Sequence, residues 1–159
     1  VIYQHGGIYM DTDVELLRRP DALLAQKGFF IKDSTFFVNP GAGYGAVAGE
    51  ELVKDLRDYY NDKHFIMENG ECDMTASQMH GYRVLRKYGV KVNDTLQQIE
   101  GFNFYPMVMA STNVYSLQMR KSEKAYFAHY GTTTWMHDTH NESRRKNQNV
   151  ISGLTKYSL

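Results

Sequence analysis

The stretch that decides the fold reads Gly6-Gly7-Ile8-Tyr9-Met10-Asp11-Thr12-Asp13-Val14-Glu15. Glycines take positive φ at no steric cost, so the Gly-Gly pair suits the end of a helix, of which Val1 to His5 forms the last turn. Ile8 to Met10 then predicts a short buried strand. Asp11 and Asp13 follow where this strand runs out into a loop.

Two carboxylates one residue apart at the end of a buried strand are costly to desolvate, and they repel each other. A hard divalent cation such as Mg²⁺ or Mn²⁺, itself bound to phosphate oxygens, resolves both problems. The pattern therefore predicts a metal site at Asp11 and Asp13. The alternative is a solvated acidic turn, which the Gly-Gly pair and the apolar run disfavour.

The longer stretch from Tyr3 to Glu15 resembles the Y-x-x-G-G-I-Y-x-D-x-D signature of glycosyltransferases with the DXD sugar-binding motif. This group is similar to glycosyltransferase family 32 and contains capsular polysaccharide and mannosyl transferases. The resemblance implies a GT-A-type α/β fold, a Rossmann-like mixed sheet with flanking helices, of which this chain is the C-terminal portion. It also implies a UDP- or GDP-sugar as donor substrate and Mn²⁺ or Mg²⁺ as cofactor.

Composition narrows the class of protein. The chain has 159 residues, 42% of them apolar, which is enough for one domain with a core. Its 18 basic and 18 acidic residues balance, so nucleic acid is not an expected partner. The single cysteine, Cys72, excludes an internal disulfide, and no apolar run approaches the roughly 20 residues of a membrane span. Because Val1 lies inside an apparent helix, we expect residues upstream of it.

The glycine-rich stretch from Asn39 to Ala46 predicts a loop. By resemblance it passes the donor sugar, with Gly7, Asp11, Asn39, Gly41 and Gly43 forming the donor-binding set. A glycine-rich surface turn is the open alternative. A phosphate-binding P-loop is excluded, because no Gly-Lys-Ser/Thr ends the stretch.

Two helices follow this loop. Glu50 to Tyr60 has acidic residues in its first turn and apolar residues at helical spacing. Thr75 and Gln78 predict a capping box for a second helix that Gly89 ends.

Tyr126 to His129 predicts a last strand that delivers a histidine, with a hydrogen-bonded structural role as the alternative. The family ends its site with H-x-x-x-S-W, which resembles the segment from His129 to Trp135 with Thr134 in place of serine. The spacing here is one residue longer, which leaves open whether His129 or Thr134 reaches the metal. By resemblance Asp13 binds the metal directly, and Asp11 contacts the sugar or ribose or reaches the metal through water. Zinc at His137 and His140 is disfavoured, because no cysteine or clear fourth ligand lies near.

These observations predict a catalytic domain over residues 1–142 and a basic tail over residues 143–159. By resemblance the enzyme transfers a sugar, with retention, to an oligosaccharide or lipid-linked saccharide acceptor in surface polysaccharide biosynthesis. The expected location is the cytoplasm, with peripheral association at the inner face of the membrane. No feature of the sequence predicts the oligomeric state.

Two rival functions stay open. One is an inactive remnant, or a binding module for sugar or nucleotide, that lacks the upstream half. The other is a Mg²⁺-dependent phosphatase of the haloacid dehalogenase type, which also carries Asp-x-Asp after an apolar strand. The phosphatase is disfavoured, because Glu15 replaces the expected threonine or valine and no downstream Gly-Asp-x-x-x-Asp is present.

Overall fold

The structure is a computed structural model that describes residues 1–24, 26–33, 36–112 and 122–130. Its regular elements in chain order are α1 (Ile2–His5), β1 (Gly7–Tyr9), β2 (Val14–Leu16), the 3₁₀ helix η1 (Asp21–Leu23), β3 (Gly28–Ile31), η2 (Pro40–Ala42), β4 (Tyr44–Ala46), α2 (Glu51–Asp58), α3 (Ser77–Leu85), η3 (Arg86–Tyr88), β5 (Gln97–Ile99), β6 (Phe102–Tyr105), η4 (Met107–Met109), β7 (Ala110–Thr112) and β8 (Phe127–His129). The mixture confirms the predicted α/β class.

The strands form two sheets. The larger has the order β1-β4-β3-β6-β5, in which only the β3–β6 pair is parallel, so the predicted mixed sheet is confirmed. The smaller has the order β2-β8-β7, with β2 antiparallel and β7 parallel to β8. Because β2 pairs with β8, the stretch after Asp13 lies beside the segment that ends in His129.

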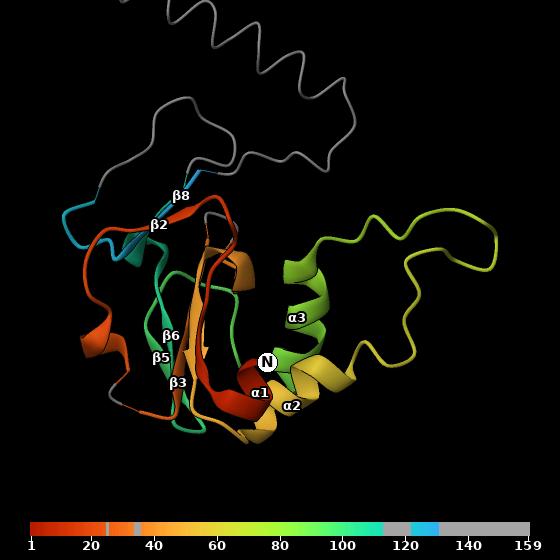
Figure 1. The fold of residues 1–159 in the computed structure, drawn as a ribbon, viewed down its shortest axis with the longest axis horizontal. Helices are drawn as coiled ribbons and strands as arrows, with labels where there is room; N and C mark the ends of the chain where they lie inside the picture. The colour runs from red at the N-terminus through yellow and green to blue at the C-terminus, as the bar shows by residue number, and fades with distance from the viewer. Residues whose placement is uncertain (25, 34–35, 113–121, 131–159) are drawn as a thin grey trace, which may run out of the picture.

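The molecule is layered, with α1, α2 and α3 on one face of the five-stranded sheet and the three-stranded sheet on the other side (Figure 1). Strand β3 is buried on both faces, which explains its uninterrupted apolar sequence. Phe30 packs toward the helices with Leu52 and Leu85, whereas Phe29 and Ile31 pack with Leu23 and Phe127 on the other side. Each face of β3 therefore has its own apolar core.

Two predictions about the strands need correction. The strand predicted at Ile8 to Met10 is present as β1, but Tyr9 is 44% exposed because β1 is an edge strand of the described sheet. The loop predicted from Asn39 to Ala46 contains β4, which lies between β1 and β3. A glycine is required in β4 because a Cβ at Gly45 would lie 2.7 Å from the Phe29 ring.

The two predicted helices are present, with one error at a helix start. Helix α2 buries Leu52 and Val53, as its apolar spacing predicts. The capping box predicted at Thr75 and Gln78 is wrong: α3 begins at Ser77 without a side-chain cap. The Gln78 amide instead donates a hydrogen bond to a buried carboxylate beneath it, described below.

A cavity of about 290 Å³ lies between the sheet and residues of the three helices. Its walls are mainly apolar and aromatic, and they include Phe30, Tyr44, Tyr60 and Gly81.

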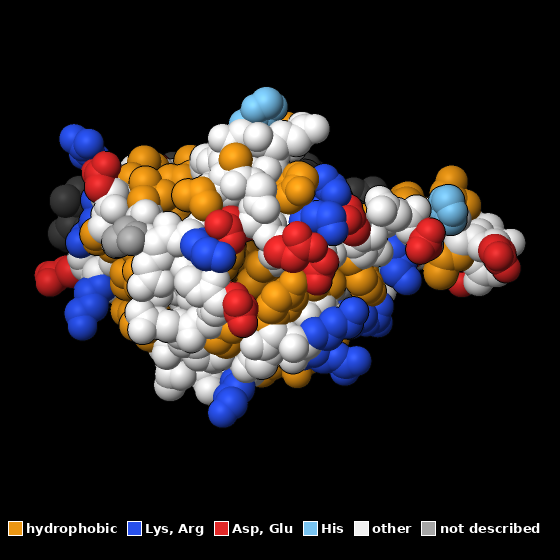
Figure 2. Space-filling view, turned by 90° about the horizontal axis from the view of Figure 1, so that it is seen from below, with side chains coloured by type: hydrophobic (Ala, Val, Ile, Leu, Met, Phe, Trp, Pro, Cys, Tyr) orange, Lys and Arg blue, Asp and Glu red, His pale blue; other side chains and the backbone are white. Residues whose placement is uncertain are grey.

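On the face shown in Figure 2, Lys and Arg side chains lie among Asp and Glu side chains, and neither sign of charge covers the face. Within the described residues, no helix has the length and apolar character needed to cross a bilayer.

Candidate functional site

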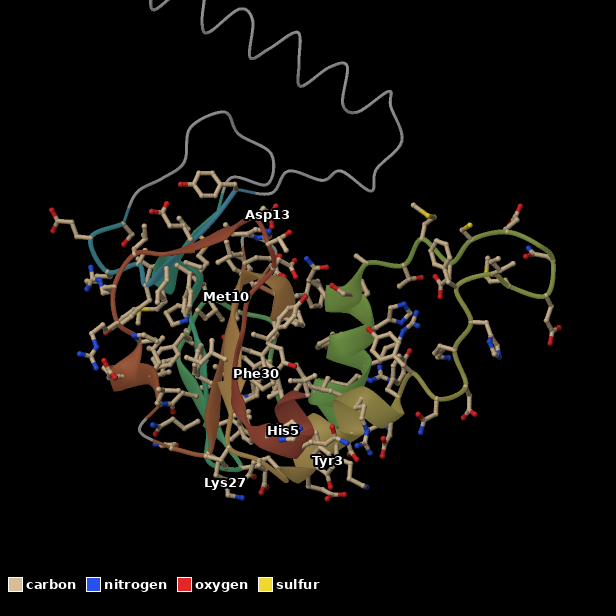
Figure 3. The ribbon with its side chains drawn as sticks, viewed as in Figure 1. Tyr3, His5, Met10, Asp13, Lys27 and Phe30 are labelled. Atoms are coloured by element: carbon tan, nitrogen blue, oxygen red, sulfur yellow. The ribbon has the colours of Figure 1, made fainter. Side chains whose placement is uncertain are left out.

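The two aspartates of the opening stretch lie in a tight turn between the two sheets. Asp11 accepts a hydrogen bond at its backbone oxygen from the Val14 N–H at 3.1 Å, which closes the turn. The chain thus leaves β1 in the large sheet and enters β2 in the small one. Figure 3 shows Met10 and Asp13 leading toward one end of the molecule, whereas His5 and Lys27 lie at the opposite end.

Strand β8 brings a histidine to this turn. His129 pairs with Val14 in the β2–β8 ladder, and the Tyr130 N–H donates to the backbone oxygen of Asp13 at 2.9 Å. The His129 Nε2 atom lies 3.5 Å from Oδ1 of Asp13, and both side chains are largely buried. Residues from near opposite ends of the described chain therefore form one cluster.

Asp11, Asp13 and His129 lie close enough together to be candidate ligands of one metal ion. One ligand atom from each lies within 4.8 Å of the others. Ligands of one octahedral ion lie about 3.0 Å apart when adjacent and about 4.2 Å apart when opposite, so the three side chains would draw closer together to bind one ion. In the described structure, Nδ1 of His129 is buried without a hydrogen-bond partner, which is costly for a polar atom. Two carboxylates and an imidazole form a mixed oxygen and nitrogen donor set, which suits Mn²⁺ better than Mg²⁺, an ion that prefers oxygen ligands.

Two phenols orient the acidic residues at the site. The Tyr9 hydroxyl donates to Oδ1 of Asp11 at 2.8 Å, and this hydrogen bond, with burial, raises the pKa of Tyr9. The Tyr130 hydroxyl donates to Oε2 of Glu15 at 2.6 Å, which likewise raises the pKa of Tyr130. Both phenols therefore stay protonated near neutral pH and keep donating to the carboxylates.

The loop from Asn39 to Ala42 contacts Asp11 through the backbone of Gly41. The Asp11 N–H donates to the backbone oxygen of Gly41 at 3.0 Å. A Cβ at Gly41 would overlap Oδ2 of Asp11, so the carboxylate occupies the space that a side chain would need. Close approach of backbone to a functional group is a common reason for glycine.

The other predicted donor-binding residues lie farther from the aspartates. Asn39 is 3% exposed, and its Oδ1 accepts from the N–H groups of Gly41 and Ala42, which makes it the cap of η2. Gly43 packs against the Phe127 ring, and Gly7 begins β1 at the end opposite Asp11. Their contacts with a donor sugar stay predictions.

Thr134, the zinc alternative at His137 and His140, and the tail over 143–159 lie outside the described residues.

Sequence reasoning missed two features of the site. Tyr9 stands two residues before Asp11 on an extended segment, so the period of two along a strand places both side chains on one face and was the available signal. Asp33 and Gln78, which lie under the loop, are far apart in sequence and had no such signal.

Comparison with known proteins gives a family match for the N-terminal segment of the chain. Residues 1–30 match the family described as "Glycosyltransferase sugar-binding region containing DXD motif". The matched segment contains α1, β1, both aspartates and β2, and it ends within β3. No curated protein and no solved structure matches the chain. The match supports a glycosyltransferase-like family and favours a transferase over the phosphatase alternative.

Proposed function

We propose that this chain carries the donor and metal site of a metal-dependent glycosyltransferase that uses a nucleotide-sugar. The observation that supports it best is the convergence of His129 on the two aspartates of a segment that matches a DXD family. The match ends at residue 30 and does not include His129. The third member of the cluster is therefore an independent observation that favours a metal role.

In this proposal, Asp13 and His129 bind the divalent cation, and Asp11 contributes a second carboxylate or contacts the donor sugar. Transfer breaks the bond between the anomeric carbon and the nucleoside diphosphate, whose oxygens gain negative charge. The cation supplies electrostatic stabilisation of that charge when bound. Tyr9 keeps the Asp11 carboxylate oriented by donating to Oδ1. The new bond joins the anomeric carbon to an acceptor hydroxyl oxygen, and the proton of that hydroxyl goes to the departing diphosphate or to solvent.

The finer assignments rest on the resemblance of the opening stretch. They are a GT-A-type fold, retention of anomeric configuration, a saccharide or lipid-linked saccharide acceptor, and a place in surface polysaccharide assembly at the cytoplasmic face of a membrane. A mixed sheet with helices on one face is compatible with a GT-A-type fold. No residue of the site is assigned as a catalytic base.

The test is calorimetric titration of UDP, and then of GDP, with and without Mn²⁺. We expect Mn²⁺-dependent nucleotide binding that Asp13→Asn abolishes while the far-UV circular dichroism stays unchanged. Asp21→Asn is the matched control, because Asp21 is an exposed acid on η1 that pairs with Arg19 at 2.9 Å. Nucleotide binding that is the same with and without Mn²⁺, or that is unchanged in Asp13→Asn, contradicts a metal-dependent site.

A binding module gives a different result in a second assay. With Mn²⁺ present, a transferase slowly hydrolyses its nucleotide-sugar donor or transfers the sugar, which releases UDP or GDP. A protein that binds the nucleotide but releases none from a panel of UDP- and GDP-sugars is a binding module. This assay separates the two readings without knowledge of the acceptor.

A further inference from the structure

A buried polar chain connects helix α3 to the carboxylate of Asp11. It begins at Asp33, which follows β3 and is only 3% exposed. Oδ2 of Asp33 accepts from the side-chain amides of Asn39 and Gln78, each at 3.4 Å. Asp33 therefore lies between the loop under the metal site and the first turn of α3.

Asn39 links Asp33 to the backbone of the loop through hydrogen bonds. Its Oδ1 accepts from the Gly41 N–H at 3.0 Å and from the Ala42 N–H at 3.4 Å. Only one orientation of the amide allows Nδ2 to face Asp33 while Oδ1 faces these donors. The carboxylate of Asp33 thus selects the amide orientation in which Asn39 caps η2.

The Gly41 backbone in turn contacts the Asp11 carboxylate. Gly41 accepts from the Asp11 N–H and lies directly against Oδ2 of Asp11, while the Tyr9 hydroxyl holds Oδ1. A shift of Gly41 therefore moves or releases the Asp11 carboxylate. Partners that orient a metal ligand commonly change metal affinity about 10- to 100-fold when they are removed.

We propose that Asp33 is a positioning residue for the metal site. Through Asn39 and the Gly41 backbone it sets the place of the Asp11 carboxylate, although it does not contact the site itself. This inference rests on the proposed function, because it assumes that Asp11 serves a divalent cation. It adds a residue that neither the DXD motif nor the match over residues 1–30 includes.

The test changes Asn39 to aspartate and then exchanges the amide and the carboxylate between positions 39 and 33. Asn39→Asp keeps an acceptor for the two loop N–H groups, but it places a second carboxylate where Nδ2 lies, 3.4 Å from Oδ2 of Asp33. We expect Mn²⁺ to bind at least tenfold more weakly at saturating UDP or GDP, whichever nucleotide the wild type binds. The double variant Asp33→Asn/Asn39→Asp reverses donor and acceptor between the two residues, and Gln78 can turn its amide so that its oxygen accepts from the amide introduced at position 33. Mn²⁺ affinity should therefore return to within about threefold of the wild type.

A background without the Asp11 carboxylate distinguishes positioning from general damage to the fold. In Asp11→Asn, the further change Asn39→Asp should alter Mn²⁺ affinity by less than about twofold. Equal losses in both backgrounds overturn the positioning role, and so does a folded Asn39→Asp protein with wild-type affinity. Should Asn39→Asp fail to fold, Asp33→Ala replaces it with the same expected loss and the same Asp11→Asn background.

The proposed function fails in a different way. A wild-type protein without Mn²⁺-dependent nucleotide binding overturns the proposed function and this inference together. Wild-type binding that Asp13→Asn abolishes but Asn39→Asp leaves unchanged overturns only the positioning role of Asp33.

Discussion

Gly41→Ala should weaken metal binding without weakening the fold. Gly41 lies outside the positive-φ region, so alanine fits its backbone. The added Cβ would overlap Oδ2 of Asp11 and lie 2.9 Å from Cγ, whereas carbon atoms in contact prefer about 3.5–4.0 Å. Asp11 is a half-buried side chain that can turn away at the cost of its hydrogen bond from the Tyr9 hydroxyl. The substitution therefore displaces the carboxylate by about 1 Å and leaves the surrounding core in place.

The size of the effect follows from that displacement. For direct binding of Asp11 to a divalent cation, a retreat of the carboxylate from about 2.1 Å to about 3.1 Å loses about 1.3 kcal/mol with the dielectric constant of water. This corresponds to about tenfold in affinity, and a lower local dielectric constant makes the loss larger. Replacing glycine by alanine at a compatible position adds about 0.4–1 kcal/mol of stability. We therefore expect Mn²⁺ affinity to fall at least about tenfold while the melting temperature stays constant or rises.

The assay is a Mn²⁺ titration at saturating nucleotide, with free Mn²⁺ measured by electron paramagnetic resonance. Gly81→Ala is the matched control, because a Cβ there meets nothing within 4 Å and Gly81 lies in α3. Wild-type Mn²⁺ affinity in a folded Gly41→Ala protein would refute the reasoning. It would mean either that Asp11 does not contribute to cation binding or that cation binding does not depend on the position of the Asp11 carboxylate.

The remaining predictions concern other parts of the chain. His129→Ala should weaken Mn²⁺ binding about tenfold or more, and an unchanged titration would assign the imidazole a structural role. Gly81→Ala should raise the free energy of unfolding in urea by about 1 kcal/mol, because alanine favours a helix interior, whereas Gly45→Ala should lower it because of its overlap with Phe29. Burial and a hydrogen bond to Asp55 raise the pKa of Tyr88 from 10.0 to about 12, so the protonated phenol favours the folded state. This contribution is complete below about pH 10 and is lost as pH rises toward about 12, so urea unfolding at about pH 9 and 11 should show a loss that Tyr88→Phe lacks.

The sequence was most informative where the local pattern and the tertiary environment agree. The helical spacing predicted from Glu50 to Tyr60 is present as α2, which buries Leu52 and Val53, and the glycine after Tyr88 ends a helix with φ of 91°. Each residue there has the propensity that its place in the fold needs, so the pattern alone was enough.

The errors arose where tertiary contacts outweighed local preference. Glycines normally indicate a loop, but Gly45 lies in a central strand because the Phe29 ring occupies the space beside it. Gln78 had the spacing of a capping residue, yet its amide faces Asp33, a residue distant in sequence. The approach of His129 to Asp13 was inferred only by resemblance, since nothing local to either residue specifies the β2–β8 pairing.

Under the proposed function, the pairing of β2 with β8 would couple cation binding to the folding equilibrium. The three candidate ligands come from near opposite ends of the described chain, so an unfolded chain does not hold them together. A ligand that binds only the folded state stabilises it by about 2.7 kcal/mol at a concentration 100 times its Kd. Chelation should therefore open the small sheet first, and hydrogen exchange at the Tyr130 amide, which bonds to Asp13, should report that opening. Metal supply would then set how long this protein persists in its folded form, in addition to whether its site is active.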